Sequence, residues 1–147
     1  MKIAKLFSYF LIIAFVGLAT VSCLDDDTNQ EFLTYGYVPG TEISYNLDSV
    51  QPVNKPTKFE VKYTLTGNCQ EFIEFRKLNS STTLRTDVGV FASQKNNAQC
   101  TNDLRIETKT FTVTPREAGE NTVRVWAGKN ELGEDIFISQ TFNVPAE

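Results

Sequence analysis

The chain has 147 residues, with 14 Lys and Arg against 18 Asp and Glu and a formal net charge of −4. This is the length of one domain, and the mildly acidic balance argues against a nucleic-acid-binding module. The chain contains no His, which excludes Ser-His and Cys-His catalytic pairs and His-ligated metals. Because 41% of the residues are hydrophobic, the chain has enough apolar side chains for one packed core.

The amino-terminal residues have the three-part pattern of a secretory signal peptide. Lys2 and Lys5 supply the positive charges, residues 6–18 are predominantly apolar, and small residues follow. The apolar segment is shorter than the roughly 20 residues that a membrane-spanning helix requires. We therefore predict that residues 1–22 are a cleaved signal peptide.

A cysteine follows the signal segment directly. Residues 20–23, Thr-Val-Ser-Cys, resemble a bacterial lipobox, in which the cysteine is lipidated and becomes the first residue of the mature protein. The resemblance implies that Cys23 is the lipid-attachment residue and that the protein is held at a membrane by this anchor. More than one acyl chain anchors a protein stably, because each buried CH₂ contributes about 0.8 kcal/mol.

An acidic run stands immediately after this cysteine. Asp25, Asp26 and Asp27 resemble the surface-export signal of lipoproteins in the Bacteroidota, although a solvated spacer would have the same composition. The resemblance implies an outer-membrane lipoprotein of the cell envelope that faces outward. We expect residues 23–40 to form a lipidated acidic tether.

The remaining residues, 41–147, have the pattern of a small β-sandwich. Short runs of alternating apolar and polar residues are separated by turn residues and prolines, and no stretch has helical periodicity. Leu104 and Ile106 are out of phase with Phe111, which predicts a bulge near residues 108–110. The fold class that we predict is all-β, a single Ig-like or fibronectin-type antiparallel sandwich of about seven strands. The expected strands are 42–47, 58–66, 70–77, 82–92, 104–113, 122–127 and 135–144.

The closing segments, residues 122–129 and 134–138, are similar to those of small Bacteroidota lipoproteins. Together with the lipobox and the acidic run, they extend the resemblance over most of the chain. The resemblance implies a surface-exposed lipoprotein with an Ig-like sandwich, and it implies no particular activity.

Two cysteines remain after the lipidated one. Cys69 lies between the second and third predicted strands, and Cys100 lies between the fourth and fifth. In an up-and-down chain alternate turns lie at the same end of the sandwich, and an envelope location is oxidising. We predict a disulfide between Cys69 and Cys100, with two unpaired loop thiols as the alternative.

Without His, an enzyme is left with carboxylate, Lys, Tyr or hydroxyl chemistry, and the catalytic candidates are carboxylate pairs. Glu71 and Glu74 are three positions apart, so on a regular strand they point to opposite faces and cannot flank one substrate bond. Glu131, Glu134 and Asp135 lie in the turn before the last strand, where acids are solvated or hold Ca²⁺ weakly, and their spacing lacks the EF-hand pattern. We therefore predict no enzyme, no cofactor and no metal site.

The last two predicted strands bring aromatic residues together. If Val125 and Ile138 face the core, Trp126 and Phe137 are neighbours on the outer face, with Arg124 along the same side. Such a pair can stack on a sugar or anchor a protein partner. Alternatively, the pair stiffens the hairpin or is covered by apolar residues of the tether, which are Phe32, Leu33, Tyr35 and Tyr37.

A modification motif stands in a predicted loop. Asp48-Ser49-Val50 resembles the O-glycosylation motif of the Bacteroidota, which makes Ser49 a candidate O-glycosylation residue.

Two functions follow from these features, and a small hydrolase is a third hypothesis, which a deep pocket with two facing carboxylates would favour. The first is a non-enzymatic outer-membrane lipoprotein whose sandwich is a binding or accessory module, with another envelope protein or a glycan as its partner. The second is a carbohydrate-binding lipoprotein that uses exposed aromatic side chains. The exposure of Trp126 discriminates between them, because a buried ring cannot serve as a platform.

Overall fold

The computed structural model describes residues 32–96 and 99–146. These residues form eight strands and one short 3₁₀ helix. They are β1 (Phe32–Val38), β2 (Gly40–Ser44), η1 (Leu47–Ser49), β3 (Thr57–Thr66), β4 (Gln70–Lys77), β5 (Arg85–Asn96), β6 (Leu104–Val113), β7 (Gly119–Lys129) and β8 (Asp135–Val144).

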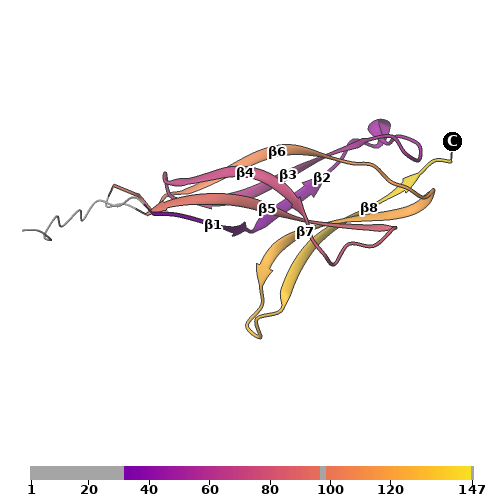
Figure 1. The fold of residues 1–147 in the computed structure, drawn as a ribbon. Helices are drawn as coiled ribbons and strands as arrows, with labels where there is room; N and C mark the ends of the chain where they lie inside the picture. Colours follow the sequence, from indigo (N-terminus) through magenta and orange to yellow (C-terminus); the bar gives the residue numbers. More distant parts are fainter. Residues whose placement is uncertain (1–31, 97–98, 147) are drawn as a thin grey trace, which may run out of the picture. The chain divides into compact units, whose positions relative to one another are not determined.

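The strands form two sheets that pack face to face (Figure 1). One sheet has the order β2-β3-β6, and the other contains β1, β4, β5, β7 and β8. β5 is the centre of the five-stranded sheet, because β4 pairs along one of its edges while β1 and then β7 pair along the other. The predicted all-β sandwich is confirmed. One pair departs from the antiparallel expectation, since β5 and β7 run parallel over four residues.

The added strand is β1, which lies within the range predicted as a tether. It pairs with β5 from Phe32 opposite Asn96 to Val38 opposite Val90, so the described sandwich begins at Phe32 and not at Thr41. The strand was missed because its residues do not alternate between apolar and polar. Its Leu, Tyr and Tyr side chains occupy the outer face, where polar residues are expected.

The core lies between the two sheets and follows from period-two alternation. In β3 the side chains of Phe59, Val61, Tyr63 and Leu65 are fully buried, while the residues between them face solvent. Each fully buried side chain of this size contributes about 1.5–3 kcal/mol to folding. The opposite sheet supplies mainly small branched residues, which are Val88, Val90, Ala92, Val123 and Val125.

The expected bulge in β6 is absent. The pairing of β3 with β6 is continuous from Thr57 opposite Val113 to Thr66 opposite Leu104. Leu104 and Ile106 therefore keep the phase of the strand and point outward, where they are 70% and 72% exposed. Their positions differ from the apolar pattern of Phe111 and Val113 because Leu104 and Ile106 are apolar residues on the outer face. The register of β6 itself does not shift.

A bulge is present instead in β4, where the register on β5 shifts between Phe72 and Glu74. The extra residue lets Phe72 and Phe75, three positions apart, both pack against the core. It also places Glu71 and Glu74 on the same outer face, so the expectation that they point to opposite faces was wrong.

The predicted disulfide between Cys69 and Cys100 is confirmed, with their Cα atoms 5.4 Å apart. It joins the β3–β4 turn to the loop after β5 at one end of the sandwich. The two loops also contact directly, because Gly67 N donates to Asp103 O at 2.8 Å. A Cβ atom at Gly67 would overlap the carbonyl of Thr101, so only glycine permits this approach.

Replacing both Cys69 and Cys100 with Ser should lower the free energy of unfolding by about 3–4 kcal/mol, because the bond closes a loop with a sequence separation of 31. The native circular dichroism spectrum should be retained, since the buried hydrophobic core between the sheets has more than one dozen residues and includes neither cysteine. Thermal melting of the variant beside the oxidised protein measures the change. An unfolded variant would contradict the view that the core folds without this crosslink.

Candidate functional site

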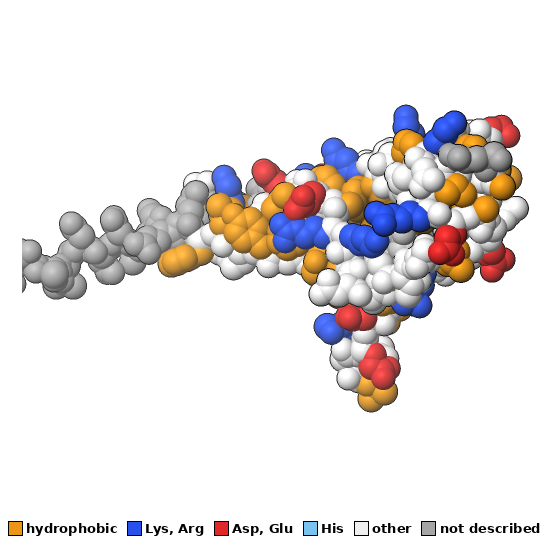
Figure 2. Space-filling view, turned by 45° about the vertical axis from the view of Figure 1, so that its right-hand side comes forward, with side chains coloured by type: hydrophobic (Ala, Val, Ile, Leu, Met, Phe, Trp, Pro, Cys, Tyr) orange, Lys and Arg blue, Asp and Glu red, His pale blue; other side chains and the backbone are white. Residues whose placement is uncertain are grey.

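The outer face of the five-stranded sheet gathers aromatic and arginine side chains. Cross-strand register places Tyr37 opposite Phe91 and Trp126 opposite Phe137, all pointing away from the core. Figure 2 shows one face of the molecule, on which hydrophobic and basic side chains are interspersed. We call the outer side of the five-stranded sheet around these rings the aromatic–arginine face, and its residues are Tyr35, Tyr37, Arg76, Phe91, Arg124, Trp126 and Phe137.

The β1 side of this face is a cluster of rings around Phe91. Tyr35 stacks on Phe91 with centroids 6.1 Å apart, and Tyr37 meets it edge to face at 5.5 Å. The Tyr37 ring lies against Gly89, where a Cβ would come within 2.5 Å of the ring. A glycine at this strand position therefore lets the tyrosine pack on the backbone. Tyr35 remains 60% exposed and Tyr37 remains 42% exposed.

The β7–β8 side contains the residues predicted from the sequence. Trp126 and Phe137 are cross-strand neighbours as expected, and Arg124 lies over the Phe137 ring at 4.3 Å. Trp126 is half-buried, with Tyr37 against it at 6.2 Å and with its Nε1 donating to Asp135 Oδ1 at 2.9 Å. Tyr37 therefore covers part of Trp126, as expected for an apolar residue of the segment before Thr41. The hydrogen bond to Asp135 fixes the orientation of the Trp126 ring.

Both phenylalanines on this face are covered by guanidinium groups. The Arg76 guanidinium carbon lies 3.3 Å from the centroid of Phe91, and Arg76 Nε donates to Glu74 at 2.6 Å. These cation–π contacts hold the arginines flat against the sheet. The rings that remain open to a ligand are therefore the two tyrosines and part of Trp126.

Asp87 fixes Arg124 in its place. The Asp87 side chain is fully buried, and Arg124 binds it through two bonds, Nε to Oδ1 at 2.7 Å and Nη2 to Oδ2 at 2.6 Å. Arg85 Nε lies 3.3 Å from the same carboxylate. Burial raises the pKa of Asp87, but hydrogen bonds from Arg124 and Ser80 and the charges of both arginines outweigh it, so the pKa lies below its ordinary value.

The β4–β5 turn also holds Asp87. Ser81 Oγ accepts a hydrogen bond from Asp87 N at 2.9 Å, and Leu78 N donates to Asp87 O at 2.8 Å. This aspartate is not among the site residues predicted from the sequence pattern. The signal was available, because a single charge within the apolar run Asp87-Val88-Gly89-Val90 requires a partner if the strand is central.

The acidic turn between β7 and β8 has internal partners. Asn130 Oδ1 accepts from the backbone N–H of Leu132 and of Glu134 at 2.9 Å each, and Asn130 Nδ2 donates to Glu134 at 2.8 Å. The Trp126 and Lys129 side chains bind Asp135 and lower its pKa. Within the described ranges, no three acidic or cysteine side chains are grouped so as to hold a metal ion.

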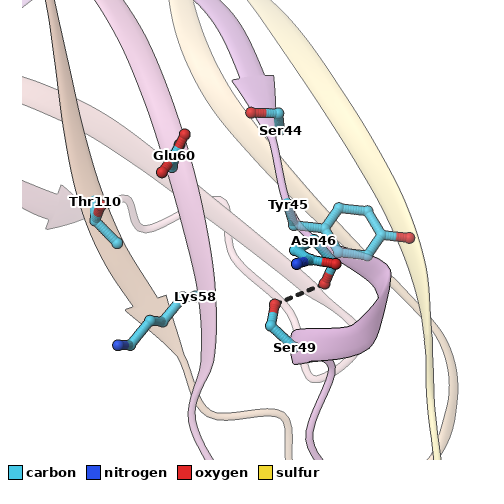
Figure 3. Close-up of a pocket in the computed structure, with 7 residues that line it drawn as sticks. All are labelled: Ser44, Tyr45, Asn46, Ser49, Lys58, Glu60 and Thr110. Carbon is cyan, nitrogen blue, oxygen red and sulfur yellow. Dashed lines mark hydrogen bonds between the residues drawn. The ribbon is translucent and has the colours of Figure 1, made fainter.

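The candidate O-glycosylation residue lies beside an open groove on the other sheet. Ser49 ends η1, is half-buried, and donates from Oγ to Asn46 O at 2.6 Å (Figure 3). The groove has a volume of about 630 Å³ and is lined by polar side chains of β2, β3 and β6 beside Tyr45. Ser49 therefore belongs to a surface distinct from the aromatic–arginine face.

The predicted lipid-attachment residue Cys23 and the predicted export residues Asp25, Asp26 and Asp27 lie outside the described residues. In the described part of the chain, no helix is long and apolar enough to cross a membrane. Comparisons with protein-family models, with curated proteins and with solved structures found no match for this chain.

Asp87→Asn should lower the free energy of unfolding by about 2–3 kcal/mol at pH 7, because it leaves Arg124 without its charge partner at a largely desolvated position. The wild-type contribution is complete above the unfolded-state pKa of about 3.9 and is lost as pH falls through the lower folded-state pKa. Urea titrations of the wild type and the variant from pH 7 downward should therefore show a stability difference that decreases as the pH falls below the unfolded-state pKa.

Glu74→Gln is the matched control. It removes a carboxylate from an ion pair with Arg76 on the same face, but both side chains are about half exposed. This variant should lower the free energy of unfolding by less than about 1 kcal/mol. Equal losses for the two variants at pH 7 would show that burial of Asp87 does not strengthen its ion pair.

Proposed function

We propose that the protein is a non-enzymatic outer-membrane lipoprotein that faces outward and uses its sandwich as a binding module. The lipobox-like residues 20–23 support attachment at Cys23, and the acidic run after them supports export to the surface. The aromatic–arginine face supports the binding role, because it is a fixed, partly apolar surface on the outside of a folded sheet. Ser49 is proposed as an O-glycosylation residue on the opposite sheet.

The composition of this face carries the proposal. Tyrosine, tryptophan and arginine are the residues that contribute most energy at protein interfaces, and they are concentrated here within one sheet. Asp87, Gly89 and Asp135 hold the rotamers of these side chains before binding. A partner would therefore bind with little further loss of side-chain conformational entropy. We therefore assign another envelope protein as the partner.

A carbohydrate is the second candidate, and one observation favours it. The Tyr35 ring is 60% exposed and stacks nearly parallel on Phe91, with an interplanar angle of 9°. A flat ring backed by a second ring is a suitable platform for a pyranose. The covered faces of Phe91 and Phe137 reduce the area of such a platform, because guanidinium groups occupy them.

Lipidation is tested at the mature amino terminus. Mass spectrometry of the full chain, expressed in a diderm bacterium, should show an amino terminus at Cys23 carrying diacylglycerol and an amide-linked acyl chain. Cys23→Ser should abolish both cleavage and membrane association. An unmodified Cys23, or cleavage elsewhere, would disprove the anchor.

Binding is tested by photo-crosslinking in intact cells. Ser139 is exposed on the outer face of β8, opposite Arg124, and benzoylphenylalanine at this position should form an adduct with a different protein. Adding Trp126→Ala should reduce the yield by about tenfold or more, because truncating an interface tryptophan commonly costs 2 kcal/mol or more.

Glu60 provides the control position, because it is exposed on the outer face of the other sheet. Benzoylphenylalanine there should give no such adduct. Equal adducts from both positions, or none from Ser139, would contradict a protein partner on the aromatic–arginine face. Retention of the full chain on immobilised glycans, lost on Tyr35→Ala, would then support the carbohydrate function.

A further inference from the structure

Strand β1 is an edge strand that lacks protection against pairing with another chain. Among the described residues it pairs with β5 only, so the backbone groups of its other edge have no neighbouring strand. Its sequence, Phe-Leu-Thr-Tyr-Gly-Tyr-Val, contains no charge and no proline, and its register on β5 continues without a bulge. Natural sheets commonly avoid such edges, because they pair readily with other strands.

Two other free edges show how this chain protects an edge strand. β4 contains a bulge and the Arg76–Glu74 ion pair. β6 carries Arg105 and Glu107 on the face that points to the core, where they pair with each other at 3.2 Å and where Glu107 accepts from Tyr63. Inward charges of this kind disfavour the addition of a further strand.

The remaining edges are protected in other ways. β2 has only five residues, its register shifts between Gly40 and Glu42, and Glu42 pairs with Lys62. On β8, the Tyr45 hydroxyl donates to the Thr141 carbonyl at 3.4 Å. Among the described edges, β1 alone combines the absence of charge, of proline, of a bulge and of a side-chain hydrogen bond to its free backbone edge.

The side chains of β1 are also unusually exposed for their type. Phe32 is 62% exposed, Leu33 is 50% and Tyr35 is 60%. Leu33 and Tyr35, with Tyr37 at 42%, are alternate positions on the outer face and form an apolar strip there, while Phe32 lies on the opposite face of the strand. Apolar surface of this continuity marks an interaction site more often than an isolated exposed residue does.

Gly36 in the middle of β1 has no explanation within one copy of the chain. A Cβ at Gly36 would meet nothing within 4 Å, and its φ is not positive. Each of the other described glycines either has a positive φ or lies against neighbouring atoms. A glycine inside a strand costs stability, and one recognised reason for it is the close approach of another backbone.

We propose that a second copy of this chain pairs with β1 along its free edge, antiparallel about a two-fold axis at Tyr35. In this arrangement Tyr35 lies opposite Tyr35 of the second copy, Leu33 lies opposite Tyr37, and Thr34 lies opposite Gly36. Every side chain thus meets an uncharged one, and aromatic cross-strand pairs are favourable. The contact is isologous and closes after two copies, so it does not propagate into a fibre.

A second copy fits this edge because the segment is complementary to itself. A strand that carried charges would leave them without partners beside an uncharged edge. One strand and a few side chains bury less than the roughly 1,200 Å² of a standard stable interface, so the pairing is reversible. The proposal does not depend on the lipid anchor or on a partner at the aromatic–arginine face.

The experiment uses two copies of the full chain with different carboxy-terminal tags, co-expressed and extracted in mild detergent. Wild-type copies should copurify through either tag. Tyr35→Glu with itself, and Tyr35→Lys with itself, should reduce copurification by about tenfold or more, because like charges then meet at the axis. Co-expressing Tyr35→Glu with Tyr35→Lys should restore it.

Ile106→Glu is the matched control, since Ile106 is 72% exposed on the edge strand β6, and its copurification should equal that of the wild type. Formation of the Cys69–Cys100 disulfide, measured on non-reducing gels, checks that each variant folds. If Tyr35 variants fail this check, Leu33→Glu combined with Tyr37→Lys in the other copy repeats the test. Absence of wild-type copurification, undiminished pairing of Tyr35→Glu, or failure of the opposite charges to restore pairing would overturn the proposal.

Discussion

The pairing of β5 along both of its edges is the constraint on which the rest of the structure depends. Between Val88 and Gln94 its backbone is engaged by β4 on one side, and by β7 or β1 on the other. Its side chains alternate strictly, so Val88, Val90 and Ala92 enter the core while the residues between them point outward. A shift of one residue would exchange these two sets and would bury Asp87 in the core without its arginine.

The same alternation determines what the outer face contains. Asp87, Gly89 and Phe91 are successive outward positions of β5, and each has one function on that face. Asp87 holds Arg124, Gly89 accepts the ring of Tyr37, and Phe91 supports Tyr35. Three strands that are distant in sequence thus present one surface because a single central strand sets their register.

The strands and contacts that could be predicted from the sequence are those whose residues show a local pattern of polarity. β3 was predicted because its inward and outward residues differ in polarity, and the pairing of Trp126 with Phe137 followed from the hairpin alone. The disulfide followed from turn parity and compartment. β1 was not predicted, because Leu33, Tyr35 and Tyr37 are apolar residues on an outer face and hide the alternation. The ion pair of Asp87 with Arg124 was not predicted either, since it depends on the parallel contact of β5 with β7, which local pattern does not encode.

The disulfide has one more consequence, which concerns covalent continuity. It closes residues 69–100 into a ring that contains all of β4 and β5. A protease that hydrolyses any one peptide bond inside this ring leaves a single covalent molecule, because the two fragments stay joined through sulfur. The central strand of the five-stranded sheet is therefore retained with both flanking parts of the chain after a single cut.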